Sequence, residues 1–391
     1  MALAILVNTL GSGLFLPLSA LYFTQVVGLR AGQVALGLGI ASVAGVVSGI
    51  PLGRLADRQG ARQVQVALLA AMGVLTFGYV FVATAWQFTA LATLITALDR
   101  GVSGVAAALV ADSVPPSERV AARAYTRSVV FFGLALGSSL SAVALRLGTP
   151  LAYRWAIALD AATFLAAAAL YLRLPRALPR PAALRPSPWQ ALRDRPYVTV
   201  TGLFSVLGMY NTTVTFALPL WVLHRTSIPG EFISLAFAVN TIGHVLLQVP
   251  VSRRVRSWRS ARRTAGIGGI SLLLACCCFA ATARTAPWPG AALLTAGVLL
   301  NLTGGLCAAS AQFYIAFGLA PEGAQGQYQG LVSSGASVSA MLAPTLSTLL
   351  PLGLGEPGWA LLGALFVGAS LGVGPVVNAG IRRLRTAQLQ P

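Results

Sequence analysis

The sequence is poor in the charged residues that cover a water-facing surface. Only 9% of its 391 residues are charged, lysine is absent, and nine acidic residues stand against 27 arginines. A soluble protein carries roughly a quarter charged residues. With 56% hydrophobic residues and a mean hydropathy of +0.77, the chain does not belong to the proteins that fold mainly in water.

Residues that carry most enzyme and metal chemistry are also scarce. Only His224 and His244 supply imidazole groups, and neither an H-E-x-x-H spacing nor a Gly-rich phosphate loop after a strand occurs. All four cysteines lie inside apolar stretches without the spacing of a metal site or a disulfide framework: Cys276, Cys277, Cys278 and Cys307. We therefore predict no enzyme, no metal site and no cofactor.

Apolar stretches of about 20 residues, each able to cross a hydrocarbon core of roughly 30 Å as a helix, recur along the chain. Six are predicted at 3–27, 32–53, 64–85, 87–113, 121–145 and 150–172. Six more are predicted at 197–223, 231–252, 262–284, 290–318, 326–350 and 357–379. The first stretch has no basic leader and is too long for a signal-peptide core, so we expect it to be retained as a span.

Residues 173–196 divide the two sets of spans. They hold six Arg, one Asp and six Pro, which favours a basic, extended linker over another helix. We expect domains at 1–172 and 197–385, with a tail at 386–391. If both termini are cytoplasmic, 21 of the 27 arginines lie in inner segments. The net charge of +18 then reflects membrane topology, not nucleic-acid binding.

The two halves of the chain resemble each other. Phe15-Leu16-Pro17-Leu18 aligns with Ala217-Leu218-Pro219-Leu220, and Pro51-Leu52-Gly53-Arg54 aligns with Pro250-Val251-Ser252-Arg253. The sequence offsets are 202 and 199, and basic segments follow the second pair in both halves. Such internal repeats are typical of transporters built from duplicated bundles.

The sharpest local motif follows the second span. Residues 53–62 read G-R-L-A-D-R-Q-G-A-R, and they resemble the loop 2/3 signature of the major facilitator superfamily, G-x-L-a-D-r-x-G-r-k. The sequence departs from that signature at Ala61, where a basic residue is usual. The positions that carry the resemblance are Gly53, Leu55, Asp57, Arg58, Gly60 and Arg62.

The resemblance implies an all-α membrane protein with twelve transmembrane helices in two pseudo-symmetric six-helix bundles. It also implies that Asp57 anchors a contact near the cytoplasmic start of span 11 that holds an outward-open state. Gly53 and Gly60 would permit close helix approach and a tight turn in the loop. The alternative is a basic turn that serves topology alone.

A second resemblance lies in span 4, where Arg100 and Gly104 match the family's R-x-x-x-G segment. An arginine near the middle of a bilayer costs at least about 2.5 kcal/mol, so it should face a cavity or a partner. Asp99 and Asp160 are candidate counter-ions, and related antiporters use this arginine in proton coupling. Neighbouring residues on a helix point about 100° apart, so we expect Asp99 and Arg100 to face different partners.

The span 5 antiporter motif, G-P-x-x-G-G, is poorly kept in residues 133–142, which have spaced glycines but no proline. Antiport is therefore inferred less directly than transport.

In the family, spans 1, 4, 7 and 10 line a central cavity, and polar or aromatic stripes are expected there. Span 1 carries such a stripe at helical spacing: Asn8, Ser12, Phe15, Ser19 and Tyr22. Candidates in spans 7 and 10 are Tyr210, Asn211, Thr215, Asn301 and Gln312. Hydrogen bonds between helices could satisfy all of these groups without a ligand.

Span 8 carries Asn240, His244 and Gln248 four residues apart, on one helix face. A histidine in a span can relay protons, and it can equally be a neutral buried residue. We include His244 with Asp99, Arg100 and Asp160 as candidates for proton coupling.

The sequence favours proton-coupled export of amphiphilic organic molecules, such as drugs, by a monomer in the bacterial cytoplasmic membrane. Its expected partners are a small-molecule substrate, protons and membrane lipids, with no nucleic acid. Uptake of a sugar or another nutrient is the alternative within the same fold. A membrane-embedded enzyme and a non-transporting receptor are alternatives outside it.

Overall fold

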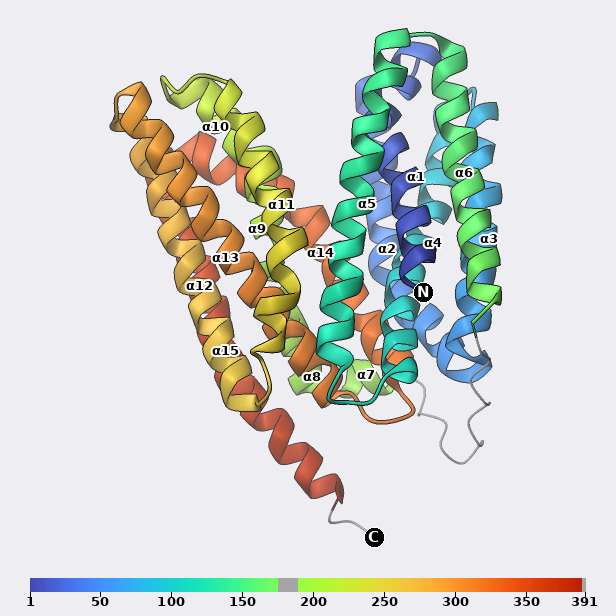
Figure 1. Ribbon diagram of the computed structural model, residues 1–391, viewed down its shortest axis with the longest axis vertical. Helices are drawn as coiled ribbons and strands as arrows, with labels where there is room; N and C mark the ends of the chain where they lie inside the picture. The colour runs from blue at the N-terminus through green and yellow to red at the C-terminus, as the bar shows by residue number, and fades with distance from the viewer. Residues whose placement is uncertain (175–188, 389–391) are drawn as a thin grey trace. The chain divides into compact units, whose positions relative to one another are not determined.

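The computed structural model describes residues 1–174 and 189–388, which form helices joined by short turns and contain no strand (Figure 1). The helices of the first half are α1 (Ala2–Leu21), α2 (Ala31–Gln59), α3 (Ala61–Gly78), α4 (Ala85–Ser113), α5 (Arg119–Leu147) and α6 (Pro150–Leu172). A π-helical turn, Tyr22–Val26, extends α1, and a 3₁₀ turn, Tyr79–Phe81, extends α3.

The second half begins with the short α7 and a span built from several pieces. Its helices are α7 (Gln190–Arg193), α8 (Arg195–Gly208), α9 (Tyr210–Thr212), α10 (Leu218–Arg225), α11 (Glu231–Arg253), α12 (Trp258–Ala281), α13 (Pro287–Leu319), α14 (Gln325–Thr348) and α15 (Glu356–Gln388). A π-helical turn, Thr213–Ala217, joins α9 to α10. Twelve helical segments of the described chain are long and apolar enough to cross a membrane, as the sequence predicts.

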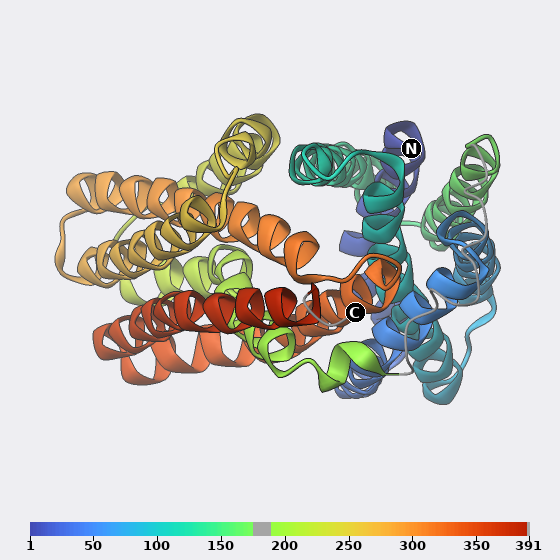
Figure 2. The ribbon, with the colours of Figure 1, turned by 90° about the horizontal axis from the view of Figure 1, so that it is seen from below.

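The described chain forms two compact units. Unit 1 comprises 1–116, 125–191 and 321–337, and unit 2 comprises 117–124, 192–320 and 338–391. In unit 1, α2 packs on α4, and α6 packs on α1 and α3. In unit 2, α12 packs on α13 and α15, as Figures 1 and 2 both show. The first residues of α5 therefore belong to unit 2, and the first residues of α14 belong to unit 1.

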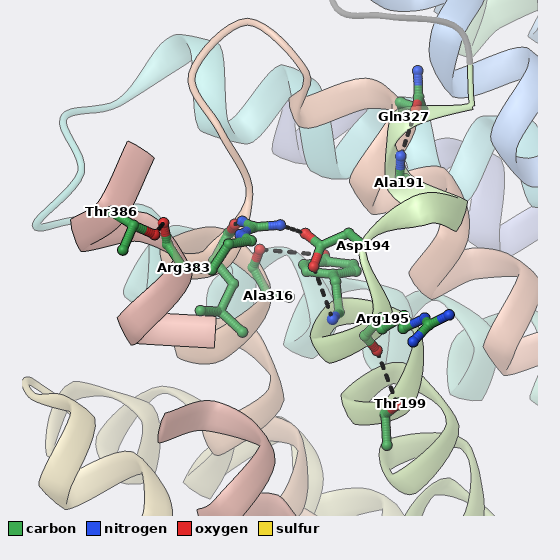
Figure 3. A network of polar contacts seen from close by, with 10 residues as sticks. Ala191, Asp194, Arg195, Thr199, Ala316, Gln327, Arg383 and Thr386 are labelled. Atoms are coloured by element: carbon green, nitrogen blue, oxygen red, sulfur yellow. Dashed lines mark hydrogen bonds and ion pairs between the residues drawn. The ribbon is translucent and has the colours of Figure 1, made fainter. Parts of the chain in front are cut away.

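Helix starts follow local signals in the sequence. Thr149 caps α6 by accepting a hydrogen bond from the Ala152 N–H at 3.2 Å, and Pro150 occupies the first turn, where no N–H is needed. Asp194 caps α8 through the Tyr197 N–H and forms an ion pair with Arg383 of α15 (Figure 3).

The structure differs from the sequence prediction at several boundaries, and the largest difference is at α15, which continues to Gln388 instead of ending at 379. Helix α2 continues to Gln59 instead of ending at 53, so most of the motif is helical and only Gly60 makes the turn. Charged residues look like a membrane break in the sequence, but they do not interrupt backbone hydrogen bonding. The predicted extended linker contains α7 at its end, while its residues 175–188 lie outside the described residues.

Aromatic side chains form the centre of each unit. In unit 1 the Phe23 ring lies 4.4 Å from the Phe88 ring and 5.0 Å from the Tyr79 ring, measured between centroids. In unit 2 the buried Trp221 indole N–H donates to the Phe279 carbonyl at 3.0 Å, and its ring meets Trp359 edge-on. Satisfying the indole N–H in this way is needed where no water is available.

The turn between α2 and α3 depends on the backbone of Gly60. Its φ of 97° and ψ of 130° lie in a region that residues with a Cβ atom rarely adopt. A Cβ added there would meet nothing within 4 Å, so any cost of substitution comes from the backbone.

We predict that Gly60→Ala and Gly60→Asn both destabilise the protein by about 1–3 kcal/mol, because neither residue favours this conformation. Thermal unfolding of the purified protein in detergent measures the change. Gly32→Ala is the control, since Gly32 is helical and equally uncrowded. Equal melting temperatures for all variants would contradict the prediction.

Candidate functional site

The carboxylate of Asp57, in the last turn of α2, lies at the N-terminus of α14 within unit 1. Its Oδ1 accepts a hydrogen bond from the Gly326 N–H at 2.7 Å, and its Oδ2 accepts one from the Gln327 N–H at 2.8 Å. The first N–H groups of a helix have no partner within the helix and carry partial positive charge, so they favour an anion. Asp57 is buried, which strengthens both charge-assisted bonds.

Two pairs of glycines bring the backbones of α2 and α14 into contact. A Cβ added at Gly53 would lie 2.0 Å from the Gly326 carbonyl oxygen, and one added at Gly326 would lie 2.3 Å from the Gly53 carbonyl oxygen. Gly49 and Gly330 face each other in the same way, at 2.4 and 2.2 Å. Both helices therefore carry a G-x-x-x-G pattern that places the glycines on one face.

The remaining motif residues serve different neighbours. Arg62 reaches the C-terminal end of α6, where Nε donates to the Tyr171 carbonyl at 3.1 Å and Nη2 donates to the Leu172 carbonyl. A cation is favourable at that end of a helix. Leu55 packs into the apolar cluster between α3, α4 and α6, whereas Arg58 is exposed.

Unit 1 contains a partly open cavity of about 250 Å³ between α1, α2, α3, α4 and α6. Its wall is mainly aromatic and aliphatic, with rings from Phe15, Phe23, Tyr79, Phe88 and Phe164. Four serine and threonine residues also line it: Ser12, Ser19, Thr76 and Thr96. The charged residues that line it are Asp99, Arg100 and Asp160, so three of the four coupling candidates meet in one cavity.

Asp99 and Arg100 form an ion pair despite being neighbours on α4, with 3.6 Å between Arg100 Nε and Asp99 Oδ2. Of the two candidate counter-ions, Asp99 is therefore the one near Arg100, because the long arginine side chain bends back to the adjacent carboxylate, although Nε makes no hydrogen bond to a described residue. The Arg100 backbone carbonyl also accepts a hydrogen bond from the Ser333 hydroxyl at 2.6 Å.

Asp160 is 3% exposed and stands apart from that pair. No described residue donates a hydrogen bond to its Oδ1, and no ion pair joins its carboxylate to a described cation. Gly11 of α1 makes room for the carboxyl group, since a Cβ there would lie 2.7 Å from Oδ1. A buried, ionised carboxylate without a partner is costly, so this group is stable either protonated or paired with a cation. A role for Asp160 in proton coupling stays a prediction.

The residues of the predicted stripe in span 1 lie in different surroundings. Ser12, Phe15 and Ser19 line the cavity. The Asn8 side-chain oxygen is buried without a hydrogen-bond partner among the described residues. Tyr22 is buried in the aromatic cluster, and its hydroxyl donates to the Tyr79 carbonyl at 3.3 Å.

Tyr210 and His244 meet in the interior of unit 2, where their rings stack at 5.8 Å with 8° between the planes. His244 Nδ1 lies 2.8 Å from the Asn240 carbonyl oxygen, which only accepts, so Nδ1 carries a proton. In the neutral imidazole, Nε2 is then an acceptor for the Tyr210 hydroxyl at 3.2 Å. The histidine therefore has good partners on both nitrogens without a ligand.

Gln248 lies in a separate buried cluster of unit 2. Its Nε2 donates to the Ser252 hydroxyl at 3.1 Å and to the Ser310 hydroxyl at 3.3 Å. The Asn240 and Gln248 side-chain oxygens have no hydrogen-bond partner among the described residues.

The other candidates of spans 7 and 10 lie near this part of unit 2. Asn301 donates to the Tyr210 carbonyl at 3.4 Å, and the Thr215 hydroxyl donates to the Asn211 carbonyl at 3.0 Å. Gln312 is half-buried in α13. A ligand role for these residues stays a prediction.

Sequence reasoning missed the partners of the motif. Gly49, Gly326 and Gly330 form half of the backbone contact, and their spacing was readable in the sequence as G-x-x-x-G in both helices. It also missed the aromatic wall that α3 and α4 contribute to the cavity, since Tyr79 and Phe88 show no pattern that separates them from ordinary core residues.

Comparison with known families identifies the class of protein. Residues 1–226 match the Major Facilitator Superfamily, and because this is more than half of the sequence, the chain belongs to that superfamily. It is accordingly a multi-pass membrane transporter and not an enzyme. No match is found among curated proteins.

Solved transporters share the fold. The human organic anion transporter TETRAN is 18% identical, with a TM-score of 0.70 over 96% of this chain and 97% of that chain. A bacterial homologue of the iron transporter ferroportin is 14% identical, with a TM-score of 0.72 over 97% and 98%. The proton:xylose symporter XylE is 13% identical, with a TM-score of 0.69 over 95% and 94%. At these identities the likeness establishes the fold alone.

We predict that Gly53→Ala destabilises unit 1 by about 1–3 kcal/mol, because the new methyl group would collide with the Gly326 carbonyl and push α14 away. Gly39→Ala, on the same helix with nothing within 4 Å of its Cβ, should leave stability unchanged or raise it. Thermal unfolding compares the two variants, and equal losses would contradict the close contact.

We also predict that Asp57→Asn loosens the start of α14, since the amide lacks the charge and offers only one acceptor oxygen. Hydrogen exchange at the Gly326 and Gln327 amides should accelerate by about tenfold or more, as measured by mass spectrometry. Glu231→Gln, in unit 2, is the control and should leave these amides protected. Unchanged exchange in Asp57→Asn would show that the carboxylate does not hold this helix.

Proposed function

We propose that this transporter exports amphiphilic organic molecules, such as drugs or secondary metabolites, and that proton entry drives the export by alternating access. The observation that supports it most is the cavity of unit 1, which combines an aromatic wall with one buried carboxyl group that has no cationic partner. Pockets of this composition bind mainly apolar molecules and orient them through a few polar groups.

Sugar uptake fits the cavity less well. Sugars present many hydroxyl groups that need amide or carboxylate partners, and no described residue lining the cavity is Asn or Gln. The cavity's two carboxylates, Asp99 and Asp160, and its few hydroxyl groups offer few partners for a ring that carries hydroxyls on every side.

Asp160 is the proposed proton carrier of the cycle. Its carboxyl group can hold one proton, and in the ionised form no described cation neutralises it. Arg100 is already paired with Asp99, so its proposed role is to hold that pair at the cavity wall. If Asp160 released its proton on the cytoplasmic side and the substrate left on the opposite side, proton entry would be coupled to substrate export.

The contact between α2 and α14 is the proposed conformational latch. Alternating access requires that one side of the transporter opens while the other closes, so the Asp57 hydrogen bonds and the glycine contact would form and break once in each cycle. Two hydrogen bonds and two pairs of glycines hold α2 and α14 together, and a contact of this small size can break and re-form in each cycle.

For the orientation, we propose a bacterial cytoplasmic membrane with both termini in the cytoplasm and bundle boundaries at 1–172 and 197–385. The support is the distribution of arginine, 21 of 27 of which then lie in inner segments. We propose that one chain suffices for transport.

Transport by purified protein in liposomes tests this function. With an acidic lumen, the protein should accumulate fluorescent amphiphilic dyes, and dissipating the pH gradient with nigericin should stop accumulation. Asp160→Asn should reduce gradient-driven accumulation to the level of protein-free liposomes, because no carboxyl remains to carry the proton, while Glu231→Gln should transport normally. If wild-type protein moves no amphiphile under the gradient, the proposal is wrong.

A further inference from the structure

The cavity of unit 1 is lined by more acidic than basic groups. Two carboxylates, Asp99 and Asp160, line it against one guanidinium, that of Arg100, so the cavity carries one net negative charge when all three groups are ionised. Arg100 lies 3.6 Å from Asp99 and forms no ion pair with Asp160. Asp160 is 3% exposed and has no hydrogen bond to Oδ1 from the described residues. The cavity is therefore complementary to a molecule that carries a single positive charge.

The size of the cavity limits that molecule. A volume of about 250 Å³ lies below the roughly 300–1,000 Å³ typical of sites for drug-sized ligands. The enclosed part of the cavity therefore suits one aromatic ring with a short carbon chain better than several fused rings. Phe15 and Phe164 line the same cavity as Asp160 and supply apolar surface for such a ring.

We propose that the cavity of unit 1 is the binding site for small aromatic amines, with one ring among the aromatic side chains and one protonated amine paired with the Asp160 carboxylate. The inference rests on the proposed export function and narrows its substrates. The amine gains a charge-assisted hydrogen bond in surroundings of low dielectric, and the ring faces attract the cation as well.

Other classes of ligand fit the same site less well. An organic anion would face two carboxylates, Asp99 and Asp160, against the single guanidinium of Arg100. A neutral amphiphile could fill the volume but would leave Asp160 without a partner. A zwitterion would need a second cation to match its carboxylate.

The proton and the amine compete for the same carboxylate. The other titratable groups that line the cavity are Tyr79 from the turn after α3, and Asp99 and Arg100 from α4; α1 and α2 contribute none. Because an arylalkyl amine stays protonated at neutral and acidic pH, acidification should weaken its binding only by protonating the protein. One proton would then exchange for one amine.

Binding to the purified full-length protein tests the site, with 2-phenylethylamine as the probe. Calorimetry should show tighter binding than for 2-phenylethanol, which replaces the amine by a hydroxyl, by about tenfold or more, and no binding of phenylacetate. Amine affinity should fall as the pH is lowered far enough to protonate the carboxylate, while 2-phenylethanol affinity stays constant, because protonation removes the charge that pairs with the amine. Equal affinities for amine and alcohol would overturn the proposal.

Substitution of Asp160 tests whether its carboxylate is the group that binds the amine. Asp160→Asn should lower amine affinity to that of the alcohol without changing alcohol binding. Glu356→Gln, which alters a carboxylate that does not line the cavity, should leave amine affinity unchanged. Amine binding that survives in Asp160→Asn would place the amine elsewhere.

Carbodiimide labelling of the wild-type protein tests the site without a variant that has to fold. N,N′-dicyclohexylcarbodiimide reacts with protonated carboxyl groups in apolar surroundings, and mass spectrometry would detect its adduct at Asp160. Excess 2-phenylethylamine should protect Asp160, and 2-phenylethanol should protect less. Protection that is equal for both compounds would contradict an ion pair at this carboxyl.

Two combinations of results separate the amine site from the export function. Gradient-driven accumulation of a neutral dye such as Nile red, together with no preference for the amine, would leave export standing and remove the amine site. Selective amine binding with no gradient-driven flux of any compound would support the site and overturn export.

Discussion

Lipid offers no hydrogen-bond partner to the groups that face it, and this constraint governs every polar residue in the protein. With nine acidic residues in the whole chain, each buried carboxylate needs a partner supplied by the fold. The buried Asp57 receives two backbone N–H groups from α14, while the half-exposed Asp99 lies 3.6 Å from Arg100 Nε. The buried Asp160 has no partner of either kind among the described residues, and we propose that a proton or a cationic substrate neutralises it.

The same constraint explains the contrast between the two units. In unit 2, His244 and Tyr210 satisfy each other, and Gln248 donates to two serine hydroxyls. These groups stabilise the interior of a helical bundle without any ligand. The groups of unit 2 that lack a partner among the described residues, such as the Asn240 and Gln248 side-chain oxygens, are neutral amides. In the cavity of unit 1 they belong to charged groups, Arg100 and Asp160.

Much of the fold could be predicted from the sequence, because a span needs a long apolar run and such runs are unmistakable. The prediction of 150–172 agrees with α6 since Thr149 and Pro150 mark its start. The end of α2 could not be read from hydropathy, because a helix continues past the membrane until the backbone turns, here at Gly60. The partner of Asp57 lies 269 residues away, and no local pattern encodes that distance. The pairing of Asp99 with Arg100 depends on side-chain bending, which helical spacing does not describe.

The meeting of Gly49 and Gly53 with Gly326 and Gly330 joins two helices through their main chains. Glycine has no side-chain rotamers to lose, so association at this surface carries no side-chain ordering cost and separation regains none. The contact can therefore be both close and readily reversible. A larger residue on either helix would prop the surfaces apart, and its own rotamers would add an entropic term to every opening and closing.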